Sequence, residues 1–206
     1  MPRILVTAYG PYDEWPDNVS WLVLQELTRA LPADCPVTTR LYPVDFSVVK
    51  ARLANDMRDE FDVAIHLGQA PGRATIALEA VGLNLACERG QRAEDAVPLM
   101  ADGPAAYCSR LPLGEWAAML NEAGIPAEVS HHAGTYLCNA ALYLSHYFGE
   151  RTGKQTASSF LHLPLDPSQV LASGPVMPSL PAAVSATAVR MLIEKALQRS
   201  LKSRGS

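Results

Sequence analysis

The sequence predicts an α/β protein, a single-domain three-layer α/β/α sandwich around a mainly parallel, partly mixed and twisted sheet. Strand-like and helix-like segments alternate through the first half of the chain, an order typical of a parallel sheet with helices on both faces. A length of 206 residues suits one domain, and apolar residues make up 49% of the chain, enough for a large core. We expect residues 1–201 to form the domain and residues 202–206 to be a frayed tail.

The first half of the chain contains the most regular pattern. Three runs rich in β-branched and apolar residues are the expected strands: residues 4–7, 37–42 and 63–67. Two segments with apolar side chains at helical intervals are the expected helices: residues 20–30 and 45–60. Ser20 is the expected N-cap of the first helix, and Asp45 or Ser47 that of the second.

The second half of the chain is less regular. Residues 76–85 alternate loosely between apolar and polar, which indicates an antiparallel excursion or hairpin. Residues 87–104 form a polar, turn-rich loop, long enough to suggest a function. Helices are expected at residues 113–123, 136–148 and 181–201, and short strands at residues 129–130 and 158–163. Thr135 is the expected N-cap of the middle helix.

The charge balance favours a small molecule, a peptide or another copy of the chain as the partner. Seventeen basic and twenty-one acidic residues give a net charge of −4, which predicts neither nucleic-acid nor anionic-membrane binding. The first residues are too short an apolar run for a signal peptide, and three prolines interrupt residues 170–193, so no membrane span is expected. The four cysteines form no C-x-x-C pair and fit reduced thiols of a cytoplasmic protein: Cys35, Cys87, Cys108 and Cys138.

One cysteine stands where a thiol can be activated. Gly134 provides a turn into a predicted helix, and Cys138 lies near the start of that helix. A helix N-terminus presents unpaired N–H groups and a partial positive charge, which favour the thiolate and can hold a developing oxyanion. On this spacing alone, a small buried structural cysteine is the better interpretation.

A possible base follows on the next strand. His162 closes the apolar strand of residues 158–163, and strand ends are where open α/β sheets build their sites. By itself His162 fits a buried core histidine, but with Cys138 it makes a plausible nucleophile–base pair. No two histidines show metal-ligand spacing on one helix, so we expect no metal and no cofactor.

A third group could orient this base. Glu79 is a lone carboxylate in an uncharged stretch, and a buried acid needs a partner. From that stretch alone, a glutamate at a strand edge facing water is the better interpretation. The nearby loop of residues 68–72 is rich in glycine but lacks the Lys-Ser/Thr ending of a phosphate loop.

Four segments together resemble the type I pyroglutamyl peptidases. ILVTAYGPYDEWPDN resembles the family's ILVTGF-x-PF-GG loop, and GQAPGRATIALEAVGLN resembles its glutamate motif. IPAEVSHHAGTYLCN resembles the cysteine motif and FLHLP the histidine motif, in the family's order and at similar intervals. The resemblance implies a cytoplasmic cysteine peptidase without cofactor that removes N-terminal pyroglutamate from peptides, and a homo-oligomer, commonly a tetramer. It assigns Cys138 as nucleophile, His162 as base and Glu79 as the third member.

The same resemblance suggests residues that bind the substrate. Five residues are candidates for lining the pocket or steadying charge beside it: Tyr9, Tyr12, Gln69, Arg89 and Tyr136. The chain departs from the family in the first loop, where Tyr9 and Tyr12 replace phenylalanines and Asp13-Glu14 replaces paired glycines. A tyrosine adds a hydroxyl that needs a partner, and losing glycine removes easy access to positive φ, so the loop is expected to take a different path.

Two alternative functions follow. The altered loop is compatible with a related thiol hydrolase of changed specificity or weak activity. A second alternative is a non-catalytic oligomer that binds a small ligand, in which Cys138 would have no reason to react faster than the other cysteines.

Overall fold

The computed structural model describes residues 2–88, 90–173 and 176–202. Its main sheet has the order β2-β1-β3-β8-β4-β7. The strands are β1 Ile4–Tyr9, β2 Val37–Tyr42, β3 Val63–Gln69, β4 Ile76–Glu79, β7 Ala127–Ser130 and β8 Ala157–Leu163. β2, β1, β3 and β8 are parallel to one another, whereas β4 runs antiparallel to β8 and parallel to β7. The sheet is therefore mainly parallel and partly mixed, as predicted.

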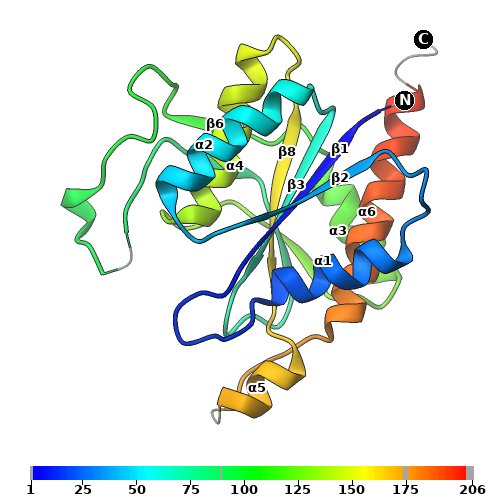
Figure 1. Ribbon diagram of the computed structural model, residues 1–206. Helices are drawn as coiled ribbons and strands as arrows, with labels where there is room; N and C mark the ends of the chain where they lie inside the picture. Colours follow the sequence, from blue (N-terminus) through cyan, green and yellow to red (C-terminus); the bar gives the residue numbers. More distant parts are fainter. Residues whose placement is uncertain (1, 89, 174–175, 203–206) are drawn as a thin grey trace.

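Helices cover both faces of this sheet. They are α1 Val19–Ala30, α2 Phe46–Asp56, α3 Leu113–Glu122, α4 Leu137–Arg151, α5 Pro167–Ser173 and α6 Ala182–Lys202, with short 3₁₀ turns η1 Met57–Asp59 and η2 Ala93–Asp95. α2 and α4 pack on one face and α1, α3 and α6 on the other (Figure 1). A small two-stranded antiparallel sheet of β5 Val81–Leu83 and β6 Ala106–Cys108 lies against α4. Among the described helices, none is long and apolar enough to cross a membrane.

The sheet divides its side chains between two cores by the alternation of each strand. Ile4, Val6 and Ala8 of β1 point to the core shared with α1, α3 and α6. Tyr9 points to the opposite core, which is formed with α2 and α4. On β8, Leu161 likewise faces α1 and α6. His162 alternates with Leu161, so it lies on the α4 face of the sheet.

Two of the predicted helix caps are wrong. Asn18, not Ser20, caps α1, because its side-chain oxygen accepts the Ser20 N–H at 3.1 Å. Ser20 Oγ instead accepts the backbone N–H of Tyr9 at 3.0 Å, which joins the helix to the end of β1. α4 starts at Leu137 after Tyr136, with no side-chain cap from Thr135. Asp45 caps α2 as expected, since it accepts the Val48 N–H at 2.9 Å.

Several further elements differ from the sequence prediction. The helix α5 and the short strand β6 were not predicted, and α6 extends to Lys202, one residue beyond the predicted domain. Residues 203–206 of the predicted tail lie outside the described residues. Residues 76–85 contain the expected antiparallel excursion, but as two separate strands: β4 enters the main sheet and β5 leaves it to pair with β6.

Candidate active site

The alternation of the central strands places three side-chain positions beneath the start of α4. Gly68 of β3 lies directly beside His162 of β8 in the parallel register. Glu79 of β4 pairs with Phe160 and is thus the diagonal neighbour of His162 on the same face. Diagonal neighbours in a sheet are within reach of long side chains. The predicted base and the lone carboxylate are therefore brought together by strands that are 83 residues apart in the sequence.

The Glu79–His162 pair is a short, buried hydrogen bond. His162 Nδ1 lies 2.7 Å from Glu79 Oε1, and the Glu79 side chain is fully buried. Burial works against a charge on His162, but the Cys138 thiol and Glu79 outweigh it and raise the pKa of His162 to about 9. Burial also works against a charge on Glu79, but hydrogen bonds from His162 and Ser130 lower the pKa of Glu79. The pair thus favours an imidazolium held by a carboxylate.

Cys138 stands in the first turn of α4 on the other side of His162. Its side chain is partly exposed, and Cys138 lies close enough to His162 to contribute to the raised pKa of the imidazole. Glycine at position 68 leaves room for this arrangement. A Cβ there would lie 2.3 Å from the Phe160 ring and 3.5 Å from Cys138 Sγ. The structure therefore brings together all three residues that the sequence singled out as nucleophile, base and orienting group.

An arginine lies behind the carboxylate. Arg73 Nη2 is 3.9 Å from Glu79 Oε1, and Arg73 Nη1 is 3.0 Å from Glu128 Oε1. The Thr75 hydroxyl donates to the same Glu128 oxygen at 2.9 Å. Arg73 thus approaches the same Glu79 oxygen that binds His162, too far away for a hydrogen bond, and its charge adds to the lowered pKa of Glu79.

The start of α4 is fixed by a buried amide that the sequence analysis missed. Asn139 Oδ1 accepts the Leu83 N–H at 2.7 Å, and Asn139 Nδ2 donates to the carbonyls of Leu83 and Leu85, both at 2.9 Å. Gly82 allows β5 this close, since a Cβ there would lie 2.8 Å from the backbone nitrogen of Tyr143. These contacts set the position of Cys138, and only the long-range partners of Asn139 reveal its role.

A small pocket opens beside the thiol. It has a volume of about 50 Å³ and is lined by Tyr9, Tyr12, Asn18, Val44, Gly68, Gln69, Tyr136, Leu137 and Cys138. Four of the five predicted substrate-binding residues therefore lie around it. Arg89, the fifth, lies outside the described residues. The ring of Tyr136 packs against Tyr12 at 5.9 Å and against Phe46 at 5.1 Å, measured between centroids, so the outer wall is aromatic.

Comparisons with known proteins agree with this geometry. Residues 2–199 match the family model described as pyroglutamyl peptidase. The chain belongs to the pyroglutamyl peptidase family. Pyrrolidone-carboxylate peptidase from Pyrococcus furiosus is 34% identical over 208 residues, which covers 97% of this chain and all of the relative. The Enterobacter sp. protein of that name is 38% identical over 208 residues and covers 97% of this chain and 95% of the relative.

Solved structures of the pyroglutamyl peptidase family have the same fold. Pyrrolidone carboxyl peptidase from Fervidobacterium islandicum matches with a TM-score of 0.88 at 30% identity, covering 96% of this chain and 99% of that chain. A mutant pyrrolidone carboxyl peptidase from Pyrococcus furiosus matches with a TM-score of 0.86 at 33% identity, covering 95% of this chain and 98% of that chain. The predicted fold class is confirmed, and so is the predicted activity: this is a family of cysteine peptidases that remove N-terminal pyroglutamate.

The first loop reaches a positive φ despite the replacement of its glycines. Asp13 has φ 58°, in the left-handed region that favours glycine and that aspartate tolerates better than most residues. The turn is closed by a hydrogen bond from the Trp15 N–H to the Tyr12 carbonyl at 3.1 Å. Asp13 therefore reaches the positive φ that its replacement of glycine was expected to hinder.

Gln69 connects the pocket to α5, the helix that was not predicted. Its Oε1 accepts the Val19 N–H at 3.0 Å and a hydrogen bond from Gln169 Nε2 at 2.8 Å. Gln169 Nε2 also donates to the Asp17 carbonyl at 2.8 Å. The side-chain oxygen of Gln69 is thus occupied in fixing the first loop, which makes it a support of the pocket wall.

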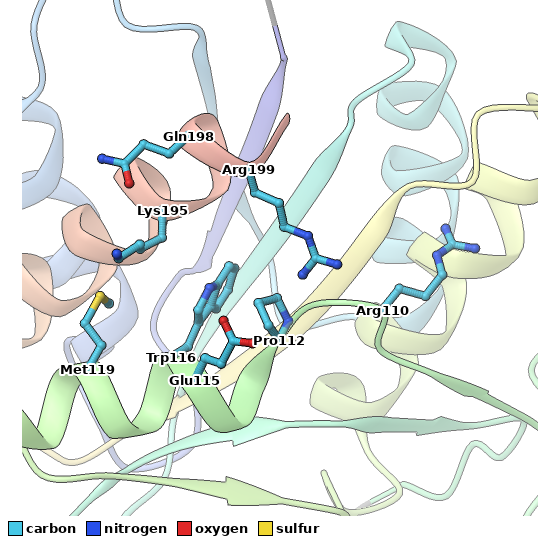
Figure 2. Close-up of a pocket in the computed structure, with 8 residues that line it drawn as sticks. All are labelled: Arg110, Pro112, Glu115, Trp116, Met119, Lys195, Gln198 and Arg199. Atoms are coloured by element: carbon cyan, nitrogen blue, oxygen red, sulfur yellow. The ribbon is translucent and has the colours of Figure 1, made fainter. Parts of the chain in front are cut away.

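The largest described pocket lies elsewhere. It has a volume of about 540 Å³ and is lined by Arg110, Pro112, Glu115, Trp116, Met119, Lys195, Gln198 and Arg199 (Figure 2). Arg110 hydrogen bonds the carbonyl of Thr156, directly before β8, whereas His162 is six residues further along, about 20 Å away in an extended strand. This pocket is therefore separate from the peptidase site.

No metal site accompanies the peptidase site in the described part of the chain. Those residues contain no group of three or more His, Cys, Asp or Glu side chains placed to hold a metal ion. The four cysteines are free thiols, so the cysteine in the site is available for chemistry.

Proposed function

We propose that the chain hydrolyses the amide bond after an N-terminal pyroglutamyl residue, with Cys138 as nucleophile, His162 as base and acid, and Glu79 as the group that orients His162. The observation that carries this assignment is the 2.7 Å hydrogen bond between the buried Glu79 and His162, with Cys138 at the start of α4 near enough to raise the pKa of His162. A base oriented by a third group beside a nucleophile is the arrangement that acyl transfer requires.

The reaction proceeds in two halves. His162 holds the Cys138 proton as an imidazolium, and the thiolate attacks the carbonyl carbon of the pyroglutamyl residue. The backbone N–H groups of the first turn of α4, which Tyr136 leaves without a side-chain cap, stabilise the oxyanion. His162 then gives its proton to the leaving amine as the carbon–nitrogen bond breaks. Water, deprotonated by His162, hydrolyses the thioester and releases free pyroglutamate and the thiol.

The pocket accounts for the choice of substrate. The pyroglutamyl ring is small and uncharged, and it fits an aromatic pocket formed by Tyr9, Tyr12 and Tyr136. An ordinary N-terminal residue would bring a charged ammonium group into this pocket, with no described carboxylate among the lining residues to pair with it. Peptides with an N-terminal pyroglutamyl residue are therefore the favoured partners.

The test compares two cysteine variants on a pyroglutamyl reporter amide. Cys138→Ser should lower kcat by more than about 10³-fold, because the site is built around a thiolate. Cys108→Ser, which changes an exposed cysteine on β6, is the matched control and should keep full activity. If Cys138→Ser keeps near-normal activity with an unchanged circular dichroism spectrum, the assignment is wrong.

Alkylation separates the peptidase from a non-catalytic binding protein. Cys108 is more exposed than Cys138, so exposure alone would make Cys108 react faster with iodoacetamide. Activation by His162 should reverse this order, so that Cys138 reacts faster than Cys108.

A panel of pyroglutamyl, prolyl and alanyl amides tests the alternative of altered specificity, which rests on the replacements at Tyr12, Asp13 and Glu14.

We also infer a cytoplasmic homo-oligomer, with a tetramer as the expected form. Free thiols favour a reducing compartment, and the family resemblance suggests the assembly. Light scattering coupled to size-exclusion chromatography measures the stoichiometry directly, and a monomer across the micromolar range would contradict it.

A further inference from the structure

Tyr9, a residue of the pocket wall, carries a buried hydroxyl group with no described partner. Its residue exposure is 4%, its Oη is fully buried, and within the described residues this oxygen has no hydrogen-bond partner. Other buried tyrosine hydroxyls have partners: Tyr42 bonds Asp56 at 2.7 Å, and Tyr143 bonds the Pro104 carbonyl at 2.9 Å. A buried hydroxyl without a partner is destabilising, so its presence calls for a functional explanation.

Aromatic neighbours hold Tyr9 in the wall of the pocket that contains Cys138. The ring is held at 6.3 Å between centroids from both Tyr42 and Phe160, which fixes it on the α4 face of the sheet. Tyr9 lines the same small pocket as Cys138. Burial first, and then the nearby Cys138, raise the pKa of Tyr9 well above its usual value, so the hydroxyl keeps its proton and can donate it in a hydrogen bond.

The chemistry of the substrate identifies the acceptor. In the proposed reaction, the carbonyl carbon of the amide bond to be cleaved lies at Cys138 Sγ, and its oxygen points to the N–H groups at the start of α4. The pyroglutamyl ring then occupies the pocket. The ring has two polar groups, the lactam N–H and the lactam carbonyl. A protonated phenol donates a hydrogen bond; the lactam N–H is itself a donor, so the carbonyl oxygen is the ring group that can accept it.

We propose that the Tyr9 hydroxyl donates a hydrogen bond to the ring carbonyl of the pyroglutamyl residue and is a specificity-determining group of this chain. The inference rests on the proposed function, because it needs the ring to be bound beside Cys138. The motif that this chain resembles has phenylalanine at this position, so the hydroxyl is an additional contact of this chain.

Tyr9→Phe removes only the oxygen. We expect the KM for a pyroglutamyl reporter amide to rise about tenfold, the effect of one hydrogen bond of about 1.4 kcal/mol, while kcat changes much less. The melting temperature should not fall, because the oxygen has no partner in the unliganded protein. Tyr42→Phe is the matched control: it breaks the bond to Asp56, so the melting temperature should fall while the KM stays unchanged.

Two ring analogues test which ring atom is contacted. 2-Pyrrolidinone and pyrrolidine-2-thione share the N–H, but the sulfur of the thione is a much weaker acceptor. The unmodified enzyme should be inhibited more strongly by 2-pyrrolidinone, and Tyr9→Phe should lose most of that preference. An unchanged KM in Tyr9→Phe, or an equal weakening of both inhibitors, would overturn the inference. Because the unmodified enzyme is assayed alongside, failure of the proposed function appears separately, as absence of pyroglutamyl hydrolysis in that enzyme.

Discussion

Replacing Glu79 by glutamine removes one buried negative charge but keeps an oxygen that can hold His162. The carboxylate oxygen lies 2.7 Å from His162 Nδ1, and the side chain is fully buried. Opposite unit charges about 4 Å apart attract by about 4 kcal/mol at an effective dielectric constant of about 20. Arg73, at 3.9 Å from the same oxygen, offsets part of this attraction. Since about 1.4 kcal/mol is a factor of ten, we expect kcat/KM to fall by about 10²- to 10³-fold.

The same substitution should move the pH profile. Burial disfavours the imidazolium, but Cys138 and Glu79 raise the pKa of His162 to about 9, so the imidazolium persists up to that pH and is lost above it. Because the leaving amine takes its proton from this imidazolium, activity falls as the pH rises through the pKa. Without the Glu79 charge this pKa is lower, and the alkaline limb of kcat/KM moves to lower pH.

The assay is hydrolysis of a pyroglutamyl reporter amide across the neutral and alkaline range. Glu150→Gln is the control, since the Glu150 carboxylate near the far end of α4 accepts a hydrogen bond from the Tyr107 hydroxyl at 2.7 Å, its one described side-chain hydrogen bond. It should leave both the rate and the alkaline limb unchanged. A Glu79→Gln enzyme with kcat/KM within about threefold of normal and an unmoved alkaline limb would refute the reasoning.

Two further predictions concern the backbone of the site. Gly68→Ala should destabilise the protein by about 1–3 kcal/mol in denaturant unfolding, because the new methyl would lie 2.3 Å from the Phe160 ring. Gly114→Ala, with open space around it on α3, is the control and should not destabilise; equal losses in both would contradict this account. Asn139→Ala should cost about 2 kcal/mol or more and lower kcat, because three hydrogen bonds that hold the start of α4 are lost. A loss below about 0.5 kcal/mol with normal kcat would show that α4 does not depend on them.

The central strands could be predicted from the sequence because their signal is local. Runs of β-branched residues at 4–7 and 37–42 identify strands whatever lies beside them, and β2 was predicted with its observed bounds. The helix caps failed for the opposite reason. Asn18 and Ser20 are both residue types that cap helices. The choice between them depends on the N–H of Tyr9, which bonds Ser20 Oγ and lies on β1, outside the helix pattern. α5 has only seven residues, too few for a periodic signal.

In the candidate site, too, the residues with a local sequence signal could be predicted and those that depend on distant partners could not. Cys138 at a helix start and His162 at a strand end could be recognised from their local patterns. The burial of Glu79 could not, because it depends on β8 and β7 lying on either side of β4. The supporting roles of Gln169 and Asn139 are equally invisible locally, since their partners are 54 or more residues away in the sequence.

The position of β8 has a consequence for when the enzyme can first act. β8 is the last strand of the main sheet to be synthesised, yet it lies between β3 and β4 and joins two otherwise separate halves. Until it inserts, the imidazole of His162 is not in place beside Glu79 and Cys138. Contacts over such long sequence separations form late and slowly in folding. A nascent or partly refolded chain therefore carries a thiol without its base, and recovery of activity should coincide with completion of the whole sheet.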